Sequence, residues 1–269
     1  MFSSRIIAGC AALLVFGMSA LNAEEDPSKK IFHPINAFIT VPFKTTFDRG
    51  ASNGSGTILN IMPFIPATMG DWNLFNRAII PVANVDGAIV GPNNPSPEQG
   101  GVASGLGDIN YALLLSPVKY DKFIWGVGPA IALPSASDDQ LGSGKWSTGV
   151  AAMVLKDFGW GNVLLRGSQI WSFAGDTERK NVNKLVIEPI ITYNMGGGWH
   201  LYTDPIISAN WKSDSHNRWI VPLGGGFGRT FKVGDQALLA RLESYYNVEK
   251  PEGAPGYSVS FTLQFVFPK

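Results

Sequence analysis

The stretch that decides the fold is Tyr257–Phe267, YSVSFTLQFVF, near the end of the 269-residue chain. Its odd-numbered residues are all aromatic or aliphatic, and its even-numbered residues are polar, with Val266 as the exception. Because successive side chains of a β-strand point to opposite faces, this pattern predicts a strand with one wholly apolar face. Aromatic residues stand at both ends of that face, about a membrane thickness apart. Such a face is typical of a lipid-facing strand with two aromatic girdles.

Other stretches repeat the alternation and add charged residues on one face only. Apolar and polar residues alternate in this way over 107–117, 184–194 and 238–243. A dry sandwich core would have to provide a buried partner for each of these charges. A watery barrel interior accommodates them directly, so the pattern favours a transmembrane barrel over a soluble sandwich.

Apolar segments and clusters of turn-forming residues alternate regularly through the whole chain after the N-terminal region. The connections alternate between short turns and longer loops, as they do in outer-membrane barrels, where the short turns face the periplasm. We therefore predict an all-β fold, a transmembrane antiparallel up-and-down β-barrel of about twelve strands. The expected strands are 36–47, 56–67, 72–82, 107–117, 123–134, 145–158, 161–173, 183–194, 199–210, 218–230, 236–247 and 256–267.

Prolines inside the expected strands conflict with a regular barrel. Proline lacks the N–H group that a ladder needs, and within sheets it is confined to edges, strand ends or bulges. A closed barrel has no edge, so we expect bulges or strand ends at these positions. The prolines concerned are Pro42, Pro63, Pro81, Pro129, Pro189, Pro205 and Pro222.

The N-terminus has the layout of a secretory signal peptide. Arg5 precedes an apolar run that ends near Met18, and small residues up to Ala23 come before an acidic run. The apolar run is shorter than the ~20 residues of a spanning helix. We therefore divide the chain into a signal peptide, residues 1–23, and a single outer-membrane β-barrel domain, residues 24–269. The one cysteine, Cys10, lies within the signal, so the mature chain is expected to have no thiol chemistry.

Composition argues against several functional classes. Lysine and arginine together equal aspartate and glutamate at 21 each, so there is no basic surface for nucleic acid. The three histidines, His33, His200 and His216, show no metal-ligand spacing, and the glycine run 224–228 does not match a phosphate loop. We expect no metal site and no cofactor, and we expect the histidines to be solvated or structural.

The charges on the inward face of the strands are the best functional candidates. Four cations and four anions on that face suggest paired charges across the interior, and such charges set solute selectivity in a narrow barrel. A structural network that only fills the lumen is the alternative. The candidate lumen and selectivity residues are Lys44, Arg77, Asp108, Arg166, Glu188, Asp204, Arg241 and Glu243.

Several blocks of the sequence resemble a known family. They are WNLFNRAIIPV (72–82), GLGDINYALLLSP (105–117), the segment 124–156, IWSFAGD (170–176) and the terminal FPK. Together they resemble the outer-membrane proteins named for the meta pathway of phenol degradation, whose members are often labelled transporters and sometimes neuromedin U. The resemblance implies an outer-membrane barrel that passes aromatic or other small molecules, and it supplies no catalytic residues.

Three functions remain open on the sequence alone. The first is a passive channel or uptake protein for small solutes, with outer-membrane lipid, a small-molecule solute and the outer-membrane insertion machinery as partners. The second is a non-conducting structural or ligand-binding barrel. The third is a lipid hydrolase built on His216 with Ser213 or Ser215, which are loop residues without a strand to fix them. We favour the first and predict that the protein is not an enzyme.

Overall fold

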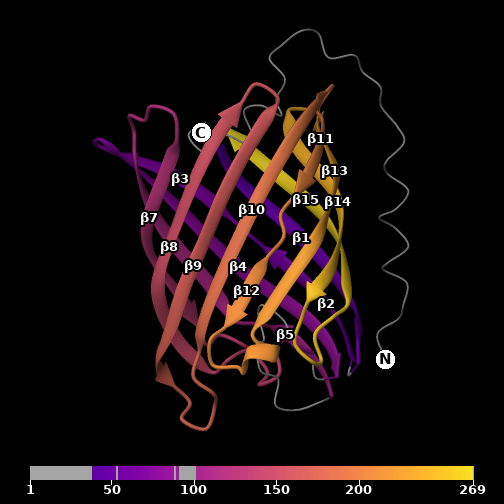
Figure 1. Cartoon of the computed structure of the whole chain (residues 1–269). Helices are drawn as coiled ribbons and strands as arrows, with labels where there is room; N and C mark the ends of the chain where they lie inside the picture. The colour runs from indigo at the N-terminus through magenta and orange to yellow at the C-terminus, as the bar shows by residue number, and fades with distance from the viewer. Residues whose placement is uncertain (1–37, 53, 88, 91–100, 269) are drawn as a thin grey trace.

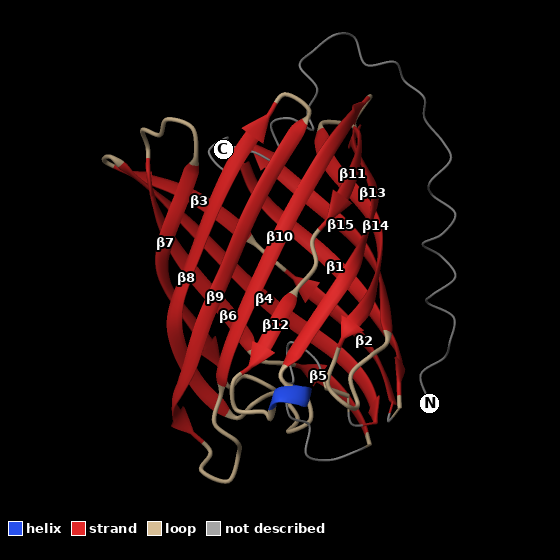
Figure 2. Cartoon of the chain, viewed as in Figure 1, coloured by secondary structure: helices blue, strands red, loops and turns tan. Residues whose placement is uncertain are grey.

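The computed structural model describes residues 38–52, 54–87, 89–90 and 101–268. The predicted signal peptide, residues 1–23, and His33 lie outside these ranges. The described chain forms a tall barrel of tilted antiparallel strands (Figure 1), with the loops gathered at its two ends (Figure 2). Its strands are β1 (Phe38–Ala51), β2 (Gly54–Ile61), β3 (Phe64–Met69), β4 (Trp72–Gly87), β5 (Val102–Leu106), β6 (Ile109–Pro117), β7 (Ile124–Leu133), β8 (Lys145–Phe158), β9 (Gly161–Gly175), β10 (Asn183–Gly196), β11 (Trp199–Thr203), β12 (Ile207–Asn210), β13 (Trp219–Val233), β14 (Gln236–Glu249) and β15 (Tyr257–Pro268).

Fifteen strands make twelve spanning strands, because three spanning strands are each interrupted once. β2 continues into β3, and both pair with β1 and β4. β11 continues into β12, and both pair with β10 and β13. β5 continues into β6, and both pair with β4, while β6 also pairs with β7. The ring closes where β15 pairs with β1, from Phe38 opposite Pro268 to Arg49 opposite Tyr257. The predicted twelve-strand antiparallel barrel is confirmed, and so are the approximate strand positions.

The connections differ between the two ends of the barrel. Residues 70–71, 159–160, 197–198 and 234–235 form tight turns at one rim, which also carries the β1–β15 chain ends. At the other rim the loops are longer, for example 134–144 and 250–256. We name them the short-turn rim and the long-loop rim.

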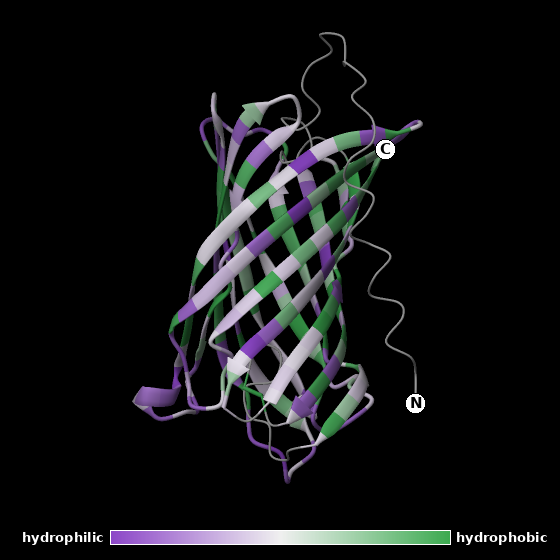
Figure 3. Cartoon of the chain, turned by 90° about the vertical axis from the view of Figure 1, so that its right-hand side faces the viewer, coloured by the Kyte–Doolittle hydropathy of each residue, from purple (hydrophilic) through white to green (hydrophobic). Residues whose placement is uncertain are grey.

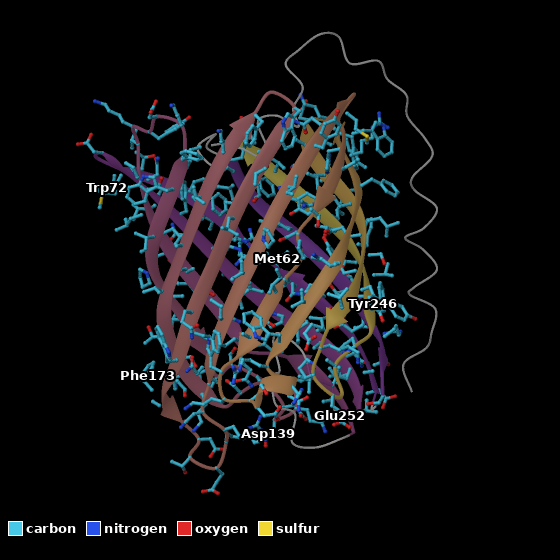
Figure 4. All side chains as sticks on the ribbon, viewed as in Figure 1. Met62, Trp72, Asp139, Phe173, Tyr246 and Glu252 are labelled. Carbon is cyan, nitrogen blue, oxygen red and sulfur yellow. The ribbon has the colours of Figure 1, made fainter. Side chains whose placement is uncertain are left out.

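Side chains alternate between the inside and the outside of the wall. On β15 the inward Ser260 and Thr262 are buried, while the outward Tyr257 and Val259 are exposed. Hydrophobic and hydrophilic residues accordingly alternate along the strands (Figure 3). Aromatic side chains such as Trp72 and Phe173 project outward from opposite ends of the wall (Figure 4). This is the arrangement of a barrel surrounded by lipid, as the alternation in the sequence predicts.

Two of the in-strand prolines lie in strand interruptions. Pro63 separates β2 from β3, and Pro205 separates β11 from β12. Pro42 lies beside the first of these interruptions and accepts a hydrogen bond from Met62 N at 2.9 Å. Pro81 lies beside the third interruption, between β5 and β6, where Gly107 N donates to its carbonyl at 2.9 Å. The hydrogen-bond ladder is therefore interrupted at positions where proline has no N–H group to donate.

The remaining prolines follow the same rule. Pro189 on β10 and Pro222 on β13 face the interruption around Pro205 from its two sides, and the β13–β14 register shifts between Val221 and Pro222. Pro129 lies where the β6–β7 ladder skips. The expected bulges and strand ends thus take the form of local gaps toward one neighbouring strand.

Within the described ranges, helical geometry is confined to a 3-10 turn at Ser215–Asn217. No helix in that part of the chain is long and apolar enough to cross a membrane. The turn is capped by Asp214, whose carboxylate accepts hydrogen bonds from the backbone N–H groups of His216 and Asn217, both at 3.0 Å. These contacts hold His216 by its backbone, and in the described structure no hydrogen bond joins its ring to a serine.

Candidate functional site

A carboxylate shared by two arginines lies at the centre of the barrel interior. Glu188 on β10 and Arg166 on β9 are direct ladder partners, and their side chains meet at 2.5 Å. Arg77 on β4 approaches the same carboxylate oxygen at 3.7 Å. Arg166 also lies 3.6 Å from Asp204, which follows the end of β11. The group thus joins residues from four separate segments of the chain.

A second group from β1 and β14 connects to the first through a tyrosine. Lys44 lies 3.6 Å from Glu243, and Glu243 accepts a hydrogen bond from the Tyr245 hydroxyl at 2.8 Å. That hydroxyl in turn accepts a hydrogen bond from the backbone N–H of Asp204 at 2.7 Å. Tyr245 therefore links the two halves of the charged interior.

The arginine on β14 completes the assembly. Arg241 stacks its guanidinium 3.9 Å from the ring centre of Tyr202, and the Tyr202 hydroxyl donates to Asp204 at 3.2 Å. We define the ion network as seven charged residues and two tyrosines. Its members are Lys44, Arg77, Arg166, Glu188, Asp204, Arg241, Glu243, Tyr202 and Tyr245.

Two backbone features make room for the ion network. The interruption after β11 removes Asp204 from the regular ladder, so its N–H is free to point at Tyr245. On the inner face of β13 stand Gly224, Gly226 and Gly228 in place of side chains. A Cβ atom at Gly226 would lie 1.9 Å from a backbone oxygen of β14. Glycine here permits the close packing that a crowded lumen requires.

The charges of the ion network are partly or fully shielded from solvent. The side chain of Glu188 is 9% exposed and that of Arg166 24%, whereas Glu243 is only 1% exposed. Removing one partner of such a pair leaves an uncompensated charge in a poorly solvated place. The contacts of the network therefore hold its charged side chains in place within the interior.

A cavity of about 240 Å³ adjoins the ion network. Lys44, Arg77, Arg166, Glu188 and Asp204 line one part of it. Another part of its lining is an apolar wall contributed by β6 to β9. The residues of this wall that line the cavity include Ala112, Leu114, Ala130, Ala151 and Ile170.

The cavity is bounded differently toward the two rims. Toward the long-loop rim it reaches Val90 and Pro255, where Val90 N donates to the carbonyl of Gly253 at 3.3 Å. Toward the short-turn rim, side chains fill the interior and are almost fully buried. Those with 2% exposure or less include Leu155, Thr192, Leu239, Thr262 and Val266. The ion network thus lies between the cavity and a packed zone.

Comparison with known proteins bears on the fold. No protein-family model and no curated protein matches this chain. Among solved structures, an outer membrane channel from Pseudomonas putida F1 matches with a TM-score of 0.59 and 16% identity, covering 86% of this chain and 94% of that one. LpxR from Salmonella typhimurium gives a TM-score of 0.42 at 10% identity, over 85% and 100% of the two chains. The chain has the fold of an outer-membrane β-barrel.

Seven of the eight predicted interior residues come together in this barrel. Asp108 is the exception, because it binds the loop between β7 and β8. Its carboxylate accepts hydrogen bonds from Ser143 N at 2.6 Å, Ser143 Oγ at 2.7 Å and Ala136 N at 3.3 Å. Asp108 is 6% exposed and does not line the cavity. Its place in the structure is that of a loop anchor.

Replacing Asp108 by alanine is expected to release the 134–144 loop. Three hydrogen bonds to a carboxylate would be lost, each contributing about 1.5–3 kcal/mol when made to a charged group. Hydrogen exchange at residues 135–144 should accelerate at least tenfold, while exchange on β14 stays unchanged. An unaltered exchange rate in the loop would show that Asp108 does not anchor it.

Sequence reasoning missed the two tyrosines and the apolar wall. Tyr245 stands two residues after Glu243, and Tyr202 stands two residues before Asp204, so alternation already places each pair on one face. The wall arises because β7 and β8 carry small or aliphatic residues on their inward face, such as Ala130 and Met153. The interior is therefore only partly polar. In the described residues no group of three metal-ligating side chains occurs.

Proposed function

We propose that this protein is an outer-membrane barrel that admits small solutes, as a passive channel or uptake protein. The observation that carries the proposal is the cavity bordered by the ion network, in a barrel whose fold matches an outer membrane channel. Charged side chains lining a narrow passage set which solutes enter it. The proposal assigns no catalytic step to the chain.

The lining of the cavity supports small solutes with an apolar part. One side offers charged groups such as Arg77 and Glu188, and the other offers the apolar wall around Leu114 and Ile170. Binding sites of this kind combine apolar surface with a few placed polar groups. Aromatic compounds, which the resemblance to the phenol-degradation family implies, fit this description.

A non-conducting, ligand-binding barrel is the second candidate. The observation that favours it is the packed zone, in which Thr192 and Leu239 are fully buried. In this case solutes enter the cavity from the long-loop rim and go no further. The two candidates therefore differ in flux and not in binding.

Single-channel recording of the refolded mature chain in a planar bilayer distinguishes them. On the channel proposal we expect discrete conductance steps, which require the packed zone to open and join the cavity to the short-turn rim. Arg166→Ala should change the ion selectivity of those steps. A correctly folded barrel that shows no conductance, yet binds an aromatic solute in isothermal titration calorimetry, would establish the ligand-binding alternative.

The proposed location in the outer membrane has its own check. The signal peptide predicts that the mature protein begins at Glu24. Intact-mass measurement of protein recovered from the outer-membrane fraction should show the loss of residues 1–23. Recovery of the full-length chain from another fraction would contradict both the export signal and the location.

A further inference from the structure

Two cations project from the outer wall near the short-turn rim. Lys156 on β8 follows the same outward face as the exposed Trp146, Val150 and Val154. Arg229 on β13 lies on the outward face with the exposed Phe227. Both strands end at the short-turn rim (Figure 1). Lipid surrounds this wall in an outer-membrane barrel, so each charge requires a counterpart.

Aromatic rings flank both cations. The ammonium of Lys156 lies 5.2 Å from the ring centre of Phe123 and 4.9 Å from that of Phe158. The guanidinium of Arg229 lies 5.3 Å from the ring centre of Trp199. Aromatic rings of this kind mark the level of the lipid headgroups.

The rings continue along the wall between the two cations. Phe158 stacks on Trp160 at 5.1 Å, and Trp160 stacks on Tyr193 of β10 at 5.9 Å. Trp199 then packs against Phe227 at 6.4 Å. Each cation therefore lies beside a group of packed aromatic rings on the outer wall.

Among the described residues, no carboxylate pairs with either cation. In the described part of the chain, the salt bridges involve neither Lys156 nor Arg229. A cation on the outward face that has no carboxylate partner among the described residues is available to an anionic group outside the protein.

We infer that Lys156 and Arg229 each bind the phosphodiester group of a phospholipid in the leaflet at the short-turn rim. The cation pairs with the phosphate oxygens, and the neighbouring rings pack on the glycerol and the first carbons of the acyl chains. A headgroup without its own cation, such as that of phosphatidylglycerol, should bind more tightly than phosphatidylcholine. The inference rests on the proposed membrane location and not on solute transport.

Native mass spectrometry of the full mature chain, released from detergent with added phosphatidylglycerol, tests this directly. The wild type should retain lipid, and Lys156→Gln with Arg229→Gln should lose about fivefold in retention for each cation removed. Lys156→Arg with Arg229→Lys keeps both charges and should retain lipid. Lys122→Gln with Lys232→Gln is the matched control, because it also removes two cations near the short-turn rim. Lys122 lies in the turn between β6 and β7, and Lys232 lies on the face of β13 opposite to Arg229.

Two outcomes would overturn the inference. One is undiminished retention in the Lys156→Gln, Arg229→Gln variant. The other is an equal loss in the Lys122→Gln, Lys232→Gln control, which would mean general attraction to a basic rim. Each single variant is tested as well, so that poor folding of the double variant leaves the question answerable. These substitutions should leave the conductance in phosphatidylcholine bilayers unchanged. The lipid-binding inference and the channel proposal can therefore fail independently of each other.

Discussion

Glu188→Gln is expected to make the conductance of the barrel more selective for anions. The substitution keeps the size of the side chain but removes the charge that Arg166 and Arg77 share, at 2.5 and 3.7 Å. Two arginines beside the cavity would then lack most of their counter-charge. The chloride-to-potassium permeability ratio, measured as the reversal potential in a potassium chloride gradient, should rise about fivefold or more. Breaking a buried pair from one side should also lower the free energy of unfolding by about 3 kcal/mol.

Opposite and neutral substitutions sharpen this test. Arg166→Gln removes a cation from the same pair and should shift the reversal potential toward potassium. Asp235→Asn removes an exposed carboxylate in a tight turn and should change neither selectivity nor stability. A shift of equal size in Glu188→Gln and Asp235→Asn would refute a role for the ion network in selectivity.

Gly226→Ala is expected to prevent the barrel from folding correctly. A Cβ atom at this position would lie 1.9 Å from the Leu242 carbonyl oxygen and 2.7 Å from Glu243 Cα. Both contacts are to backbone, so β13 and β14 would have to separate, and Glu243 would lose its position beside Lys44. Overpacking of this kind costs about 3 kcal/mol or more. Urea titration of refolding into vesicles, followed by heat-modifiable mobility on a gel, measures the loss.

Gly159→Ala serves as the matched control. Its Cβ atom would meet nothing within 4 Å, and its backbone φ is not positive. This variant should refold like the wild type. If Gly226→Ala also refolded normally, the glycines on the inner face of β13 would not be required for close packing against β14.

Alternation in the sequence predicts most of the wall of this barrel. Period-two patterning places Tyr257 and Phe267 outside and Ser260 inside, and the structure confirms this. The same parity puts Arg166 and Glu188 on the inner face, although the sequence contains no signal that makes them ladder partners. Register is the matching of facing residues on two strands. A shift of two residues leaves every side chain on the same face, so alternation cannot detect it.

The contacts that sequence did not predict depend on backbone geometry. Asp108 obeys the alternation, yet its partners belong to a loop whose path has no periodic pattern. The link from Asp204 to Tyr245 requires a strand interruption that frees one N–H group. Prolines in the sequence indicate that strand interruptions exist, but the position of each interruption also depends on the neighbouring strand. The apolar wall was overlooked because small residues such as Ala151 give a weak hydropathy signal.

The ladder between β1 and β15 joins the two ends of the described chain, from Phe38 opposite Pro268 to Arg49 opposite Tyr257. Contacts with this sequence separation carry the largest loop-closure entropy, so they form only after the intervening strands are in place. Closure is therefore the final event of folding, and until then β1 and β15 are open edges that can pair with other chains. Once β1 and β15 are paired, unfolding has to break their complete ladder in one step. The barrel is therefore expected to resist unfolding through a slow unfolding rate.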